Sequence, residues 1–497
     1  MKVGAYTFSK LGKRMAVSRV TGDFFEVPEN IFALLERCRS NGAGSLAQAV
    51  RKGGGQLDRA TIRDILEAFP DEEDVSPSDE RMPIAVSDLT LNLTSRCNLA
   101  CVYCWNDRGT YSNREFSPAA VPSGGASAAP ASEEMSLDVA RRAVDDLIRH
   151  RGEEEHLVVD FYGGEPLLNL PVLEGVIAHC RAREKDSPVK FRFLIATNGT
   201  LLTPDVAQRL VGAGVEIAVS VDGRPEVQNH NRPFPNQAGS FDVIRRNLAG
   251  MPDGLRKLLV GRATITPAFP DMVAAYHDLR DLGFERIELF ESEDACHRIT
   301  PNRAAVFFHR PDQYAHLMAE WERVARLYMD EVRAGRLNHY NTFFNRFFKL
   351  MQRLYRHHEV SGGCPAGRGQ IAVACDGRYY PCTAFIGVND YAMGDTERGL
   401  DRARLEAFLE RADKRVEHCS GCDVFALCNT SGSCLNLNLY YTGDIAKPSE
   451  QGCQLFRHKM ELAMAALATL SEECPERIEG LFGEDPSGAR GSYPVEA

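Results

Sequence analysis

The sequence predicts an α/β fold: a partial (β/α)6 barrel with a small module before it and a cysteine-rich region after it. From residue 84 to about 292, strand-like apolar segments alternate with helical ones. Such repetition implies a parallel sheet with right-handed crossovers, and six strands fit an incomplete barrel. The cysteines concentrate at 97–104 and 364–453, which places the candidate chemistry after the first barrel strand and beyond the last one.

Six strands and five intervening helices are expected in the barrel region. The strands are expected at 85–93, 157–161, 191–196, 215–221, 258–265 and 286–290, and the helices at 136–151, 171–184, 204–213, 240–249 and 271–282. Thr203 followed by Pro204 is typical of a helix start, because threonine caps the first turn and proline fits its first position. In such a fold the loops after the strands form the active site.

The rest of the chain divides by composition. Two short strands followed by helical stretches predict a winged-helix-like module, and a charged, proline-containing segment after it predicts a linker. The expected divisions are the module at 1–70, the linker at 71–83, the barrel at 84–300, a helical bridge at 301–360, the cysteine-rich domain at 361–475 and a flexible tail at 476–497.

Composition disfavours several classes of partner. The net charge is −11 and no basic tract stands out, which argues against nucleic acid. No apolar run reaches the roughly 18 residues of a membrane span, and the N-terminus lacks a signal-peptide pattern. We therefore expect a cytoplasmic protein that binds neither nucleic acid nor membrane. In that compartment 15 cysteines indicate metal rather than disulfides.

Three cysteines lie in one short loop after the first predicted barrel strand. Cys97, Cys101 and Cys104 have the spacing C-x3-C-x2-C. C-x2-C alone would suggest zinc or a redox dithiol, but zinc usually takes four ligands from two separated pairs. Three thiolates can hold three irons of a [4Fe–4S] cube and leave the fourth iron open to a substrate or cofactor. The loop therefore favours a reaction centre, and hence an enzyme.

Glycine-rich and polar segments follow the next three strands. They are Gly163-Gly164-Glu165-Pro166 after the second, Thr197-Asn198 after the third, and Ser220 and Asp222 after the fourth. Each segment alone is ordinary turn chemistry, but successive strand ends face one site. The glycines let the backbone approach a ligand closely, and Glu165 places a carboxylate beside that opening.

Eight further cysteines form a second group near the C-terminus. They are Cys364, Cys375, Cys382, Cys419, Cys422, Cys428, Cys434 and Cys453. Eight thiolates could ligate two [4Fe–4S] clusters of four thiolates each. Zinc competes, since the Cys419-x2-Cys422 pair alone would suit a zinc ribbon. The thiol density and the upstream open cluster favour iron–sulfur.

The Cys97–Cys104 loop resembles the signature of the radical S-adenosylmethionine (SAM) superfamily. The resemblance implies that these thiols hold a [4Fe–4S] cluster whose open iron binds SAM. A low-potential donor of flavodoxin or ferredoxin type would reduce this cluster, and the reduced cluster would cleave SAM to a 5′-deoxyadenosyl radical. The SAM-binding residues implied are Gly163, Gly164, Glu165, Pro166, Thr197, Asn198, Ser220 and Asp222, with Tyr103 near the adenine.

The C-terminal group resembles the SPASM domain, the twin-cluster extension of peptide-modifying radical SAM enzymes. Carried over by position, the outer auxiliary cluster takes Cys419, Cys422, Cys428 and Cys453, and the inner one takes Cys364, Cys382 and Cys434. The chain has C-x5-C from Cys428 to Cys434 where that pattern has C-x3-C, which leaves the pairing of Cys434 open. Cys375 either completes the inner cluster or is a buried strand residue, in which case an open iron of that cluster could bind a substrate thiolate.

Longer stretches, such as Leu157–Asn169 and Arg232–Asp242, are similar to the thioether-forming peptide maturases. These include the six-cysteine peptide maturases and the maturation protein of quinohemoprotein amine dehydrogenase. The resemblance implies crosslinks from cysteine sulfur to carbon in a ribosomally made peptide or small protein subunit. The N-terminal module is similar to elements that bind a leader sequence as an added strand.

Two kinds of alternative stay open. One is another SPASM modification: a carbon–carbon crosslink, epimerisation or formylglycine formation. Sulfatase maturases usually carry an aspartate directly after the cysteine that corresponds to Cys382, and Thr383 stands there, which argues against formylglycine. The other is a non-catalytic iron–sulfur or zinc scaffold that binds a peptide.

Overall fold

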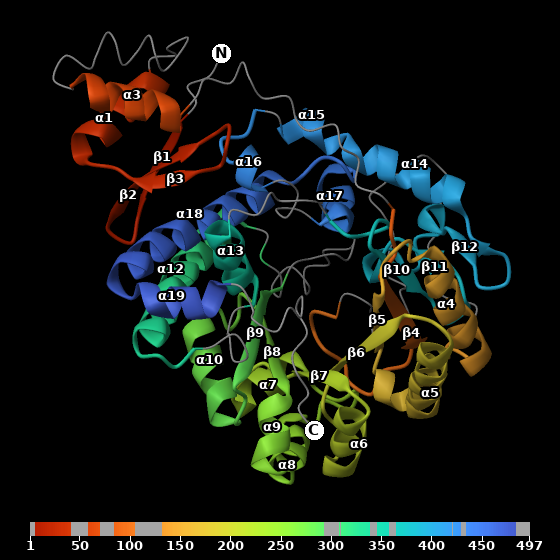
Figure 1. Cartoon of the computed structure of the whole chain (residues 1–497). Helices are drawn as coiled ribbons and strands as arrows, with labels where there is room; N and C mark the ends of the chain where they lie inside the picture. The colour runs from red at the N-terminus through yellow and green to blue at the C-terminus, as the bar shows by residue number, and fades with distance from the viewer. Residues whose placement is uncertain are drawn as a thin grey trace.

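The computed structural model describes most of the chain. The described residues are 5–40, 58–69, 84–104, 132–292, 308, 310–337, 345–356, 364–419, 421–428 and 434–483. The predicted linker at 71–83 and the last 14 residues of the predicted tail lie outside them. Figure 1 shows the barrel strands and their helices in the lower part of the molecule, with the N-terminal module at one upper corner.

Six parallel strands form the barrel sheet, which confirms the predicted fold class. They are β4 (Asp88–Thr94), β5 (His156–Gly163), β6 (Lys190–Thr197), β7 (Val215–Ser220), β8 (Val260–Ile265) and β9 (Arg286–Glu291). They pair in chain order from β4 to β9, and every neighbouring pair is parallel. Alternate residues of β5 are fully buried, as expected where one face packs against helices.

Helices connect these strands at the predicted places. They are α4 (Leu137–His150), α5 (Leu170–Asp186), α6 (Pro204–Gly212), α8 (Phe241–Ala249) and α10 (Met272–Asp281). Thr203 caps α6 by accepting a hydrogen bond from Val206 N, as expected. The sequence did not predict η3 (Pro166–Asn169), α7 (Pro225–Asn231) and α9 (Asp253–Leu258), because at four to seven residues they are too short for a helical period to show.

A C-terminal hairpin extends the barrel sheet beyond β4. It consists of β10 (Gln370–Val373) and β11 (Tyr379–Tyr380), with a turn at Gly377, whose φ is +86°. β10 pairs in parallel with β4, so that Ile371 lies opposite Leu89. The sheet order is therefore β11-β10-β4-β5-β6-β7-β8-β9. The hairpin belongs to the predicted cysteine-rich domain, yet its backbone is hydrogen-bonded into the barrel sheet.

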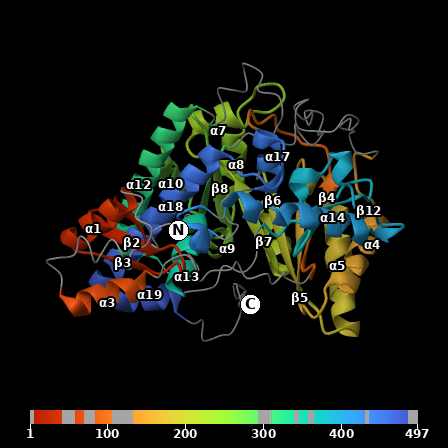
Figure 2. The ribbon, with the colours of Figure 1, turned by 90° about the horizontal axis from the view of Figure 1, so that it is seen from above.

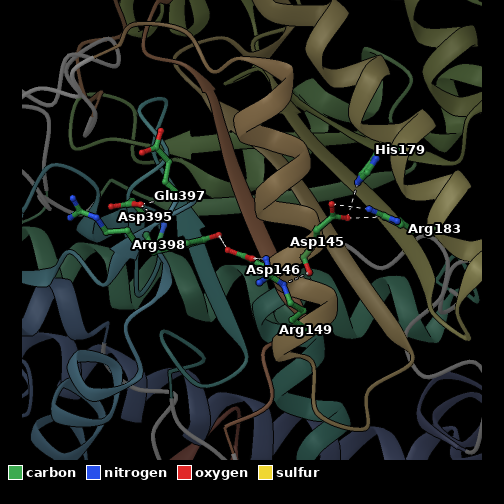
Figure 3. Close-up of polar contacts among 9 residues, drawn as sticks. Asp145, Asp146, Arg149, His179, Arg183, Asp395, Glu397 and Arg398 are labelled. Carbon is green, nitrogen blue, oxygen red and sulfur yellow. Dashed lines mark hydrogen bonds and ion pairs between the residues drawn. The ribbon is translucent and has the colours of Figure 1, made fainter.

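Polar contacts attach this hairpin and α5 to opposite sides of α4 (Figure 3). Asp146 of α4 accepts a hydrogen bond from the Tyr379 hydroxyl of β11. The neighbouring Asp145 accepts from His179 Nε2 at 2.9 Å and from Arg183 at 2.8 and 2.9 Å, both on α5. Two consecutive carboxylates therefore link α4 to the hairpin and to the next barrel helix.

The N-terminal module is a three-stranded antiparallel sheet with two described helices. Its elements are β1 (Ala5–Lys10), β2 (Lys13–Ser18), β3 (Phe24–Glu26), α1 (Glu29–Ser40) and α3 (Arg59–Ala68). The three-residue β3 was not predicted. The module packs beside α18 (Glu450–Glu473), where the Tyr6 hydroxyl donates to Glu461 (Figures 1 and 2).

The remaining helices complete the core. They are α12 (Pro311–Arg333), α13 (Asn345–Tyr355), α14 (Arg402–Asp413), α15 (Arg415–Cys419), α16 (Phe425–Cys428), α17 (Leu435–Thr442) and α19 (Pro475–Phe482). Trp321 and Phe347 stack with their ring centroids 6.1 Å apart inside the bridge. The expectation of a flexible tail from 476 is wrong up to 482, because Ile478, Leu481 and Phe482 are buried. Among the described residues, no helix combines the length and apolar character needed to cross a bilayer.

Candidate active site at the barrel mouth

The cysteine loop leaves the end of β4 and is fixed by backbone hydrogen bonds. Ala100 N donates to Pro233 O at 2.7 Å, and Val102 N donates to Asn231 O at 2.9 Å. These two bonds flank Cys101 on the loop and Arg232 on the segment after α7. Cys101 and Arg232 therefore lie opposite each other, where these two segments of the chain pair through their backbones.

The three thiols of the loop lie within electrostatic reach of one another. Burial raises the pKa of Cys97 to about 12, and Glu165 and Cys104 raise it further. Burial also raises the pKa of Cys101, with added effects of Cys104 and Cys97, while Arg232 lowers it. Because metal binding needs thiolates, loading this site would release protons. All three thiols are partly buried. Among the described residues, no group of three or more histidine, cysteine, aspartate or glutamate side chains is arranged to hold a metal ion, so cluster binding by this loop stays a prediction.

The glycine pair after β5 lies against the base of this loop. Gly164 N donates to Thr94 O at 2.8 Å, and Glu165 N donates to Arg96 O at 2.9 Å. A Cβ added at Gly163 would lie 2.3 Å from Thr94 O, and one at Gly164 would lie 2.2 Å from Arg96 O. The close approach expected of these glycines is therefore made to the cysteine loop itself.

Glu165 braces the ends of β5 and β6 against each other. Its side chain is buried, and Oε1 accepts from Thr197 Oγ1 at 2.7 Å and from Leu167 N at 3.1 Å. Oε2 accepts from Asn198 N at 2.7 Å. Burial raises the pKa of Glu165 to about 7, against the effect of these hydrogen bonds. Pro166 follows as the first residue of η3, the turn that Glu165 caps.

Asn198 extends this brace to the cysteine loop, since its Nδ2 donates to Asn98 Oδ1 at 2.8 Å. Ser220 is the last residue of β7 and is only partly buried. The structure thus brings the predicted SAM-binding residues of β5, β6 and β7 to one end of the sheet. Their contacts with SAM stay a prediction.

Asp222 is the centre of a second network, on the other side of the loop. Its Oδ1 accepts from Arg232 Nη2 at 3.0 Å and from Thr264 N at 2.8 Å. Its Oδ2 accepts from Asn231 Nδ2 at 3.2 Å and from the Tyr103 hydroxyl. Asp222 thus holds Tyr103 of the cysteine loop to the ends of β7 and β8.

Sequence reasoning missed Arg232 as a site residue. Its Cζ lies 5.2 Å from the centroid of the Tyr103 ring, and its guanidinium pairs with Asp222. No local pattern identifies it, because its partners come from the cysteine loop and from two different strand ends.

Several C-terminal thiols raise one another's pKa. Burial raises the pKa of Cys382, and Cys364 and Cys434 raise it further. Burial likewise raises the pKa of Cys453 to about 11, with added effects of Cys428, Cys419 and Cys422. These effects show which thiols lie within electrostatic reach of one another, and their assignment to an inner and an outer set stays a prediction. Their occupation by iron–sulfur clusters is likewise a prediction.

Cys375 lies at a different place, between the ends of β10 and β4. Its Sγ donates to Asn92 O at 3.1 Å and lies 3.4 Å from Asn92 Nδ2. Burial raises its pKa to about 12, with a further effect of Asp376. These contacts engage the thiol with the barrel, and a ligand role for Cys375 stays a prediction.

The family of the barrel follows from a match to the model of the Radical SAM superfamily over residues 91–253. This stretch contains the three-cysteine loop, Glu165, Asp222 and Arg232. The chain therefore carries a radical SAM domain over these residues. A [4Fe–4S] cluster and SAM are the cofactors that this superfamily implies, and Cys97, Cys101 and Cys104 are the residues that would hold the cluster.

Curated relatives are similar to this chain over stretches of different length. It is 28% identical over 158 residues to an uncharacterized protein of Methanocaldococcus jannaschii, covering 32% of this chain and 46% of that protein. It is 24% identical to the AdoMet-dependent heme synthase of Methanosarcina barkeri, covering 58% and 74%. It is 21% identical to the cysteine-type anaerobic sulfatase-maturating enzyme of Clostridium novyi, covering 70% and 87%.

A solved structure shares the fold over a longer stretch. The chain matches native anSMEcpe with bound AdoMet and Cp18Cys peptide at a TM-score of 0.62 and 19% identity. The match covers 78% of this chain and 99% of that one. At this identity the likeness concerns the fold.

Proposed function

We propose that this chain is a radical SAM enzyme that installs thioether crosslinks, from cysteine sulfur to carbon, in a ribosomally made peptide or small protein subunit. The observation that carries the proposal is the convergence of the three-cysteine loop and both carboxylate networks at one end of the sheet. Two further thiol sets accompany it in the same chain. The sulfatase-maturating relative and the peptide-bound solved structure support a protein or peptide substrate.

Cys97, Cys101 and Cys104 would hold the SAM-binding [4Fe–4S] cluster. When bound, the reduced cluster supplies the electron that cleaves SAM and so generates the radical that takes hydrogen from the substrate. The chain's own groups fix the loop that carries the thiols: the Glu165 brace on one side and the Asp222 network on the other. The reductant would be a low-potential donor of flavodoxin or ferredoxin type.

The inner and outer thiol sets would hold two auxiliary clusters. A thioether forms from one C–H bond and one S–H bond, so the reaction releases two hydrogens: one as the abstracted atom and one as a proton. One electron is left over. The two thiol sets are the groups of this chain suited to hold clusters that accept it.

The N-terminal module would bind the leader sequence of the substrate. β3 is an edge strand of its sheet, and edge strands can pair with an added peptide strand. Tethering the leader raises the effective concentration of the peptide at the barrel mouth. The module packs on α18, the helix that carries Cys453, so a bound leader would lie on the same side as the outer thiol set.

The first test is SAM cleavage by the anaerobically reconstituted full chain. With dithionite and SAM, the wild type should form 5′-deoxyadenosine. Cys101→Ala should reduce that product to background while keeping the iron of the auxiliary sets, because it removes only a ligand of the open cluster. Cys38→Ala is the control, since this buried thiol lies in α1 of the N-terminal module. Cleavage retained in Cys101→Ala would contradict the assignment.

The second test identifies the modification. The probe is a cysteine-containing precursor peptide encoded beside the gene, analysed by mass spectrometry before and after thiol alkylation. A thioether removes two hydrogens and leaves one thiol fewer to alkylate. Epimerisation would leave the mass unchanged, and a carbon–carbon crosslink would remove two hydrogens but keep every thiol reactive. Either result would replace the proposed reaction with another peptide modification.

A further inference from the structure

Arg232 has a contact pattern that the proposed function leaves unexplained. The residue is 8% exposed, and Nη2 pairs with Asp222 at 3.0 Å and with Thr264 Oγ1 at 3.3 Å. Its Nε is fully buried and, within the described part of the chain, has no hydrogen-bond acceptor. Burying such a donor costs free energy, so an unpaired N–H beside a ligand site indicates a partner that arrives with the ligand.

The backbone pairing defines where this guanidinium lies. The two hydrogen bonds between 100–102 and 231–233 set Arg232 directly opposite Cys101. The face of Tyr103 covers one side of the guanidinium, and Asp222 holds another. Asp222 also accepts from the Tyr103 hydroxyl, so one carboxylate fixes both the arginine and the loop that it faces.

Electrostatics agree with this placement. Arg232 is a permanent cation, and the backbone pairing sets it opposite Cys101. A positive charge held near a cluster favours the extra electron of the reduced state, and hydrogen bonds to cluster sulfurs act in the same direction. The ion pair with Asp222 keeps the arginine in place but takes part of its charge.

We propose that Arg232 is a positioning residue that turns its guanidinium toward the cluster sulfurs at Cys101 and raises the reduction potential of the SAM-binding cluster. The inference rests on the proposed assignment of that cluster to Cys97, Cys101 and Cys104. Asp222 then acts as the anchor of this charge, in addition to any contact with SAM. A higher reduction potential of the cluster would favour electron transfer from the low-potential physiological donor.

The test is a potentiometric titration of the reconstituted full chain, followed by electron paramagnetic resonance. The SAM-binding cluster is identified as the signal that changes when SAM is added, and its potential is then measured without SAM. Arg232→Gln should lower the ratio of reduced to oxidised cluster about tenfold at a fixed potential, or about 59 mV for a one-electron couple. Arg232→Lys, which keeps the charge, should recover most of that loss.

Asp222→Asn should shift the reduction potential of the cluster in the opposite direction. Removing the counter-charge of Arg232 should raise the ratio of reduced to oxidised cluster, whereas a loosened loop would move both variants in the same direction. Arg96→Gln is the matched control, because Arg96 precedes Cys97 in the sequence but its side chain is 57% exposed and pairs with Glu134 at 2.8 Å. Its potential should stay within the error of the wild type.

The outcomes separate the two proposals. A wild type with no SAM-responsive signal would overturn both. A SAM-responsive signal whose potential is unchanged in Arg232→Gln would overturn the role of Arg232 alone. So would weaker SAM binding at an unchanged potential, since the free N–H would then serve SAM. If both Arg232 variants lose iron, Asp222→Asn decides: a higher potential supports the proposal, and a lower one contradicts it.

Discussion

Two buried carboxylates hold the cysteine loop from opposite sides, and their charges are compensated differently. On the β5 side, Glu165 accepts hydrogen bonds from neutral groups of Thr197, Leu167 and Asn198. On the β7 side, Asp222 also accepts from the guanidinium of Arg232. The glycine-rich side therefore fixes backbone geometry with an uncompensated carboxylate, whereas the other side brings a cation to the loop. Similar side chains at equivalent strand ends can thus do different physical work.

The comparison predicts the largest loss of stability on the Asp222 side. Asp222→Ala should lower the free energy of unfolding by about 3–5 kcal/mol, because it leaves Arg232 buried and unpaired. Urea denaturation of the metal-free chain measures the effect. Asp242→Ala is the control, since Asp242 is 75% exposed and lies 3.5 Å from Arg245. If Asp222→Ala were as stable as Asp242→Ala, the ion pair with Arg232 would not stabilise the Asp222 side.

Glu165→Ala should cost less, about 2–3 kcal/mol. It leaves the Thr197 hydroxyl and the N–H groups of Leu167 and Asn198 without their acceptor, and these donors carry no charge. The same denaturation experiment applies, with Glu226→Ala as the exposed control, 73% accessible and 3.7 Å from Arg224. A loss greater than that of Asp222→Ala would reverse the comparison.

The glycine beside Glu165 tests the geometric role of this side. Gly164→Ala should destabilise the chain by about 1–3 kcal/mol and lower iron uptake at the loop, because its Cβ would meet the rigid Arg96 backbone. Gly212→Ala, near the end of α6, meets nothing within 4 Å and should be neutral or stabilise slightly. Iron content and unfolding free energy provide the readouts, and similar behaviour of the two variants would contradict the contact.

The last prediction concerns the dependence of stability on pH. The pKa of Glu165 in the folded chain is about 7, above its ordinary 4.5, so the folded state keeps a proton that the unfolded state has released. Its contribution to stability therefore falls as pH rises from about 4.5 to about 7, at up to about 1.4 kcal/mol per pH unit. Glu165→Gln should abolish that part of the slope, as measured by thermal unfolding across this range. A wild-type slope that survives the substitution would assign it to other groups.

Sequence patterns predicted the parts of the molecule that depend on neighbours in the chain. Periodicity located the strands from β4 to β9 and the five long barrel helices, because one face of each must be buried. The spacing of Cys97, Cys101 and Cys104 was informative because a single loop carries all three thiols.

Features built from distant segments were not predictable. β10 pairs with β4 across more than 280 residues, and nothing in its four residues specifies that edge. Arg232 faces Cys101 through backbone bonds that leave no side-chain pattern. Cys375 counted as a member of the C-terminal group by its position in the chain, yet its thiol is hydrogen-bonded to Asn92 of the barrel. In each case the partner is selected by tertiary packing.

The parallel pairing of β10 with β4 has a consequence for electron transfer. Because β4 and β10 are parallel, both strands end at the same end of the sheet. The cysteine loop follows β4, and the β10–β11 hairpin leads to Cys382, so one hydrogen-bonded sheet connects the two regions. A swinging motion of the C-terminal region would have to break that ladder. If the C-terminal thiols hold clusters as proposed, the tunnelling distance from the cysteine loop to those clusters would be fixed by covalent and sheet geometry when the chain folds.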